Sequence, residues 1–163
     1  MAEIHDIDPV RLRRSFGHFA TGVCVIGTTD GAGRRHGATV NSFTSVSLDP
    51  ALVLVCLGHF MRSHDVFAQA PGFCVSVLAA RQEVEARHFA SKAEEKWPEG
   101  SYVRSSHGGL RLPDCLAWFD CSRESVIPQG DHTILVGRLR DFHHADDGQP
   151  LLYFRGGFDR LSA

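Results

Sequence analysis

Short runs of apolar and β-branched residues recur along this chain, and glycine, proline or aspartate soon interrupts each of them. Examples are FATGVCVIGT, LVLVCL, FCVSVL and TILVGRL. None of these runs approaches the ~20 apolar residues that a membrane-spanning helix needs. Short strands at this spacing, with turn residues between them, are typical of an antiparallel barrel and not of a parallel sheet. The sequence therefore predicts a mostly β fold with two or three helices.

The first helix is expected to begin at Pro9, because Asp8 and Pro9 suit an N-cap and a first turn, and to continue to Gly22. Its apolar side chains share one face, which we expect to pack on the barrel. The first two strands, joined by DGAG, are expected to form a hairpin. In full, the predicted helices are 9–22, 63–70 and 81–91, and the predicted strands are 23–29, 37–46, 52–57, 73–78, 115–126, 133–142 and 151–155.

Composition limits the function classes. At 163 residues, with no repeat or linker, the chain is expected to be one domain, residues 1–163. A net charge of −2 gives no electrostatic footprint for nucleic acid or an anionic membrane, so neither partner is expected. The start MAEIHDID lacks the basic and apolar regions of a signal peptide, which favours the cytoplasm. The five cysteines include no CxxC pair and are expected to be reduced core residues.

Several common cofactor motifs are absent. The chain has no GxGxxG after a strand, which excludes a Rossmann domain, and no GxxxxGK[ST] phosphate loop. Ten histidines invite a metal hypothesis. However, His143 and His144 are adjacent on a strand, so their side chains diverge, and no HExxH or His/Cys cluster is present. No metal site is expected.

The segment HGATVNSFTSVSLDP, from His36 to Pro50, alternates small, hydroxyl and β-branched residues with scarcely a charge. In a strand, Thr39 and Asn41 would face the side opposite Val40 and Ser42. Backbone amides and hydroxyls on one face can converge on a flat polar ligand. Two later segments also stand out: GDHT at the head of an apolar run, and PLLYFRGGF near the end.

In order and spacing, six segments resemble the flavin reductase family: FATGVCVIGT, HGATVNSFTSVSLDP, LVLVCL, RHFASK, GDHT and PLLYFRGG. The resemblance covers residues 15–161. It implies an antiparallel Greek-key split β-barrel with a few flanking α-helices, a homodimer, and reduction of FMN or FAD by NADH or NADPH. Family members typically pass the reduced flavin by diffusion to a partner flavin-dependent monooxygenase.

The resemblance also assigns flavin-binding residues. Asp65 departs from the family, where a serine or threonine often stands, and this weakens the case for the neighbouring Arg62 and Ser63. The residues implied for the ring and ribityl chain are Thr39, Val40, Asn41, Ser42, Ser45, Val46, Ser47, Cys56, Leu57 and Gly58. Those implied for the phosphate and its surroundings are Arg62, Ser63, Phe89, Ala90, Ser91 and Lys92.

Within GDHT, the resemblance places His132 beside the reactive face of the flavin, where it can contact the nicotinamide. Hydride transfer needs stacking geometry more than acid-base chemistry, so His132 would orient and polarise the nicotinamide. Asp131 either fixes the tautomer of His132 or caps the turn. Tyr153, Phe154 and Arg155 either close the nicotinamide side of the pocket, in this subunit or its mate, or form a last apolar strand that ends in a surface arginine.

The region 93–113, rich in charge, proline and glycine, is expected to be a loop. Trp97 within it is expected to cover the flavin or the dimer seam, whereas Trp118 is expected to pack in the core. Two function classes follow from the resemblance. The first is an NAD(P)H:flavin oxidoreductase, and the second is a non-catalytic flavin- or haem-binding protein of the same fold.

Overall fold

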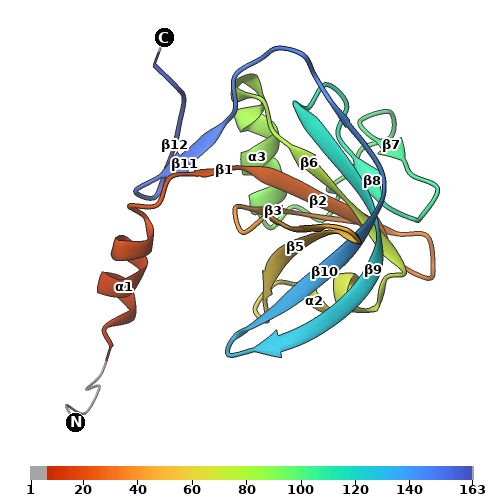
Figure 1. The fold of residues 1–163 in the computed structure, drawn as a ribbon, viewed down its shortest axis with the longest axis horizontal. Helices are drawn as coiled ribbons and strands as arrows, with labels where there is room; N and C mark the ends of the chain where they lie inside the picture. The colour runs from red at the N-terminus through yellow and green to blue at the C-terminus, as the bar shows by residue number, and fades with distance from the viewer. Residues whose placement is uncertain (1–6, 163) are drawn as a thin grey trace.

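The computed structural model describes residues 7–162 and shows an antiparallel sheet that curls into a split barrel (Figure 1). The seven strands of this sheet are ordered β3-β2-β6-β9-β10-β5-β4, and every neighbouring pair is antiparallel. The predicted mostly β, antiparallel fold is confirmed. The strands are β1 (Thr21–Gly22), β2 (Cys24–Thr29), β3 (Arg35–Val40), β4 (Thr44–Leu48), β5 (Ala51–Gly58), β6 (Gly72–Val77), β7 (Val103–Arg104), β8 (Leu110–Arg111), β9 (Ala117–Gln129), β10 (His132–His144), β11 (Leu152–Phe154) and β12 (Gly157–Asp159).

The strands β3 and β4 are consecutive in the chain but lie at opposite edges of the sheet. The prediction of one continuous strand over 37–46 is therefore wrong. β3 pairs with β2, whereas β4 pairs with β5, so the chain must cross from one edge to the other between them. Ser42 lies in this crossing: its hydroxyl donates to the Cys56 carbonyl (3.1 Å) and accepts from the Cys56 amide (2.8 Å). The predicted hairpin of β2 and β3 is confirmed.

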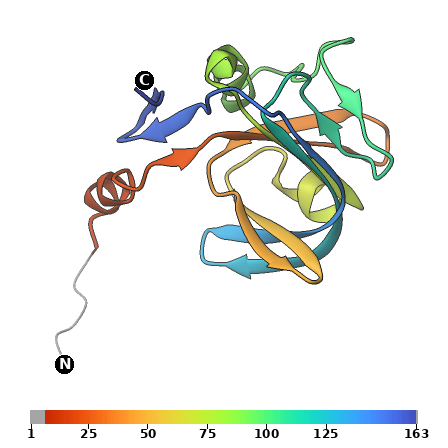
Figure 2. The same ribbon diagram turned by 45° about the horizontal axis from the view of Figure 1, so that its top comes forward.

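The two longest strands, β9 and β10, pair along their whole length and bend across the molecule (Figure 2). Their register shifts twice, between Val136 and Gly137 and between Leu139 and Asp141. A Cβ at Gly137 would lie 2.7 Å from the Phe73 ring. Glycine at this bulge therefore lets β10 bend closely over the core.

Two apolar clusters fill the structure. One lies inside the barrel, and the other lies between the barrel, α3 (Glu83–Ala90) and the 93–113 region. Trp97 is fully buried in the second cluster, with its ring centroid 4.4 Å from that of Phe89. The expectation that Trp97 covers a ligand or a dimer seam is therefore wrong. The 93–113 region is also less irregular than predicted, because it contains the short β7–β8 pair.

The remaining helices are α1 (Pro9–Phe16), α2 (His64–Gln69) and a short 3-10 turn, η1 (Ala80–Gln82). α1 ends earlier than predicted because Gly17 closes it and residues 21–22 pair with β11. It buries none of its side chains and projects away from the barrel in Figures 1 and 2, so the expected packing on the barrel is wrong.

Trp97→Ala is expected to lower the free energy of unfolding by about 3–5 kcal/mol, because it empties the centre of the second cluster. Urea denaturation at fixed protein concentration measures this loss. Trp97→Phe should cost less, since the buried indole nitrogen has no hydrogen-bond partner to lose. Val84→Ala, at an exposed position of α3, should change stability by no more than about 0.5 kcal/mol. A Trp97→Ala variant as stable as the parent would contradict the assignment.

Candidate functional site

An open groove of about 1090 Å³ runs along β3, between the end of α3 and the loop that follows β5. β3 is an edge strand, so the backbone groups on its outer side are not used in the sheet. The groove brings together most of the residues named from the sequence: Thr39, Val40, Asn41, Ser42, Cys56, Gly58, Arg62, Ser63, Phe89, Ala90, Ser91, Lys92 and His132.

Six named residues do not line this groove. Leu57 is fully buried in the barrel core. Tyr153 lines a second hollow of about 540 Å³, which shares the wall of Thr39 to Asn41 and Ala90 to Ser91 with the groove. The ring of Phe154 lies against His18, on the side of α1. The other three belong to the edge strand β4: Ser45, Val46 and Ser47.

The hydroxyls predicted to face a ligand are partly used within the protein. Thr39 donates to the Ala86 carbonyl of α3 (2.6 Å), and Ser42 is bound to Cys56 in the crossing. Ser91 donates to the His88 carbonyl at the end of α3 (2.7 Å). These side chains fix the walls of the groove.

Lys96 is a groove residue that the sequence did not single out. Its ammonium group donates to the carbonyls of Ser91 (2.5 Å) and His88 (2.8 Å), which closes the C-terminal end of α3. Burial, and then the nearby charge of Arg62, lower the pKa of Lys96 below its ordinary value. Because Lys96 and Arg62 lie close enough to disfavour each other's charge, an anion bound between them would be stabilised.

Arg62 and Lys92 form no ion pair within the part of the chain that the structure describes, 7–162. Both are exposed and line the groove near Lys96. Asp65, the acid that departs from the family pattern, binds His64 through its carboxylate (2.8 Å). Three cations, Arg62, Lys92 and Lys96, therefore line the groove together with the acid Glu94.

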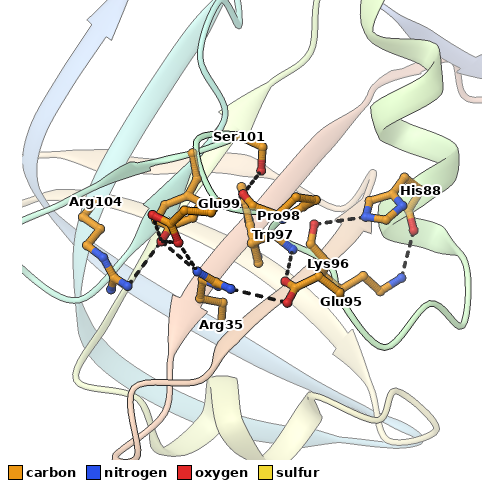
Figure 3. Close-up of polar contacts among 10 residues, drawn as sticks. Arg35, His88, Glu95, Lys96, Trp97, Pro98, Glu99, Ser101 and Arg104 are labelled. Atoms are coloured by element: carbon orange, nitrogen blue, oxygen red, sulfur yellow. Dashed lines mark hydrogen bonds and ion pairs between the residues drawn. The ribbon is translucent and has the colours of Figure 1, made fainter.

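At the start of β3 the groove is lined by Arg35, whose polar contacts are shown in Figure 3. The Arg35 guanidinium binds the carboxylate of Glu99 (2.7 Å) and lies 3.4 Å from that of Glu95. It also donates to the Tyr102 hydroxyl (2.9 Å) and lies over the Tyr102 ring, 5.3 Å from its centroid. The Tyr102 hydroxyl bond is the largest of the contacts that raise the pKa of Arg35.

His132 lies at the other end of the groove, with its side chain 42% exposed. Its Nδ1 contacts the Asp131 carboxylate at 2.6 Å, and this hydrogen bond is the main cause that lowers the pKa of Asp131. Because an ionised carboxylate only accepts, Nδ1–H of His132 is the donor, and in the neutral ring Nε2 is a free acceptor. Asp131 therefore fixes the tautomer.

The exposed Phe60 ring contacts His132 edge to face, with centroids 6.1 Å apart. It lies over Gly58, where a Cβ would meet the ring at 2.3 Å. Glycine in β5 therefore allows an aromatic wall at this end of the groove.

A hydrogen-bonded network holds the loop after β5 against the start of β10. The buried hydroxyl of Thr133 lies 3.1 Å from His59 Nε2 and 2.9 Å from His64 Nε2. The His59 amide donates to the Asp131 carbonyl (2.9 Å). Phe60, Met61 and Arg62 are thus carried on a loop that is tied to the turn bearing His132.

Three further features of the described residues concern metal binding, membrane-spanning helices and cysteines. Within 7–162, no group of three or more His, Cys, Asp or Glu side chains has an arrangement that can hold a metal ion. No helix in the described range has the length and apolarity to cross a bilayer. All five cysteines are free, and four are buried as predicted, whereas Cys56 is partly exposed and lines the groove. Burial raises the pKa of Cys24 to about 12, so its thiol stays protonated at neutral pH.

The chain matches the family described as "Flavin reductase like domain" over residues 16–162. A flavin reductase of Pseudomonas putida is 37% identical over 157 residues, which are 96% of this chain and 92% of that protein. Among solved structures, Streptomyces globisporus NADH:FAD oxidoreductase SgcE6, in complex with NAD and FAD fragments, aligns with a TM-score of 0.90 at 37% identity. That alignment covers 99% of this chain and 98% of the other. The chain belongs to the flavin reductase-like family.

A further relative, the stachydrine N-demethylase reductase subunit Stc3 of Rhizobium meliloti, is 40% identical over 151 residues. These residues are 93% of this chain but 65% of that subunit, and this chain spans 48% of another curated relative. Some relatives are therefore considerably longer than the region they share with this chain.

Proposed function

We propose that the protein is an NAD(P)H:flavin oxidoreductase that reduces FMN or FAD in the groove along β3 and releases the reduced flavin to a separate flavin-dependent monooxygenase. The observation that carries the proposal is the groove itself, in a chain of this family. It joins an unpaired strand edge, an aromatic wall next to His132, and three cations. The relative Stc3 is named as a reductase subunit of a demethylase, which supports a separate oxygenase partner.

The residues present fit a flavin phosphate. Arg62 and Lys92 are free to bind an anion, and Lys96 adds a third positive charge whose pKa is lowered by burial and by Arg62. An anion between these groups would relieve that unfavourable interaction. The outer edge of β3 offers backbone donors and acceptors to the ring, as the ring requires.

When bound, the flavin supplies the electron-accepting ring, and the protein supplies binding and orientation. Asp131 holds His132 with Nε2 facing away from the carboxylate, which suits it to accept from the nicotinamide carboxamide. Phe60 and Met61 give that end of the groove an apolar wall. The free thiols and their burial support action in a reducing compartment, the cytoplasm.

The wild-type protein is expected to oxidise NADH or NADPH only when FMN or FAD is present. Anaerobic stopped-flow at the flavin absorbance band measures this, with each nicotinamide tested against each flavin. Loss of flavin absorbance on mixing supports the reductase. If flavin binds but neither nicotinamide bleaches it, the non-catalytic binding protein is the better function.

His132→Ala is expected to leave flavin affinity nearly unchanged and to slow flavin reduction on the order of tenfold. A neutral hydrogen bond contributes about 0.5–1.5 kcal/mol net, and 1.36 kcal/mol corresponds to a factor of ten. Single-turnover reduction at saturating flavin measures the rate, and fluorescence titration measures the affinity. A variant that binds flavin poorly but reduces it at the parent rate would assign His132 to the flavin site.

The proposal includes a homodimer, because α1 needs a partner. It has 8 residues, whereas isolated helices shorter than about 12 residues are marginal in water. Phe16 is 68% exposed in the single chain, and Leu48 on the edge strand β4 is 94% exposed. A second copy of the chain would cover these side chains.

Light scattering at micromolar concentration is expected to give twice the mass of the chain. Stable dimers of this kind commonly bury more than about 2,000 Å² in total. A double variant, Leu12→Glu with Phe16→Glu, should raise the dimer dissociation constant, because it places charges on the exposed apolar face of α1. A monomeric parent would refute the dimer.

A further inference from the structure

We propose that the far end of the groove, at Arg35, binds the adenosine portion of FAD, so that the protein prefers FAD to FMN. This inference rests on the proposed function and names the flavin that the groove selects. FMN and FAD share the ring and the first phosphate, and FAD adds a second phosphate and an adenosine. The preference therefore depends on what lies beyond the phosphate-binding cations.

The groove continues well past the cations. Its lining includes every residue of β3 from Arg35 to Val40, together with Arg34 before the strand. Five steps along a strand cover about 17 Å, at roughly 3.3–3.4 Å a step. A mononucleotide whose ring lies against Thr39 and Val40 leaves the start of β3, at Arg35 and His36, to solvent, whereas a dinucleotide continues along it.

The groove is positively charged where the phosphates of FAD would lie and is close to neutral where the adenosine would lie. The middle carries Arg62, Lys92 and Lys96, which suit one or two phosphates. At the far end, Arg35 is already neutralised by Glu99 and Glu95. A third phosphate is disfavoured there, whereas an uncharged nucleoside is not.

The far end also holds a flat group at the groove wall. The Arg35 guanidinium is held by two carboxylates and by the Tyr102 hydroxyl, while its plane lies over the Tyr102 ring. Arginine planes and aromatic rings are the groups on which nucleobases stack in proteins. The carboxylates of Glu95 and Glu99 bind this guanidinium (Figure 3) and fix its position at the groove wall.

Binding of FAD, FMN and riboflavin to the purified full chain, measured by fluorescence titration without nicotinamide, tests this assignment. The parent is expected to bind FAD more tightly than FMN. Arg35→Gln should weaken FAD roughly tenfold, about 1.4 kcal/mol, and leave FMN unchanged. Arg35→Lys keeps the positive charge but not the plane, and should weaken FAD as well.

Two control variants separate this effect from others. Arg104→Gln changes a second arginine that lies over the Tyr102 ring, 5.3 Å from its centroid, but does not line the groove, and should leave FAD affinity unchanged. Arg62→Gln should weaken FMN and FAD together and spare riboflavin, which has no phosphate. Thermal unfolding of each variant shows whether it remains folded.

Equal affinity of the parent for FMN and FAD would overturn the inference, as would an equal loss of both in Arg35→Gln. The ADP portion of a nicotinamide dinucleotide is the other source of the same chemistry. If Arg35→Gln raises the KM for NADH with FMN as acceptor but spares FAD binding, the far end belongs to the nicotinamide and the inference fails. A parent that reduces FMN without any FAD preference refutes this inference alone, whereas one that binds no flavin refutes the proposed function too.

Discussion

The open seam between β3 and the β4–β5 edge is the constraint on which the rest of this structure depends. A closed barrel would use the outer backbone groups of β3 in pairing, and no strand edge would remain for a ligand. Here the chain crosses the seam at residues 41–43, and the Ser42 hydroxyl ties the crossing to Cys56 by two hydrogen bonds. The seam is thus held at one end, while the remainder of β3 faces the groove.

The groove's electrostatics follow from how α3 ends. Helix C-terminal carbonyls carry partial negative charge and need donors. Lys96 satisfies several of them, so part of its charge is balanced by the helix. Arg62 and Lys92 are not balanced in this way, and they supply the net positive charge of the middle of the groove. One buried aromatic pair, Phe89 with Trp97, holds α3 and the segment after it in the position that brings these cations together.

Much of the fold could be read from the chain, because β-branched runs and turn residues are local signals. Such signals predict the strands β5 and β6, the β2–β3 hairpin and the helix near Arg87. The break at residues 41–43 could not, because it depends on which edge each strand joins. Trp97 was misplaced for a similar reason: its segment is polar, and only tertiary packing buries it.

The candidate site, like the fold, could be predicted only in part from the sequence. The segments around residues 39–42, 89–92 and 132 are contiguous motifs, and the structure brings them to one groove. Lys96 and Arg35 carry no local signal, because a lysine or arginine in a polar region looks like a surface charge. Their roles arise from contacts in the folded chain. Lys96 reaches back five residues to the end of α3, and Arg35 binds Glu99, 64 residues further along the chain. Gly37 is an intermediate case. A glycine inside a strand indicates a close approach, and a Cβ there would lie 2.6 Å from Phe89 and from Trp97.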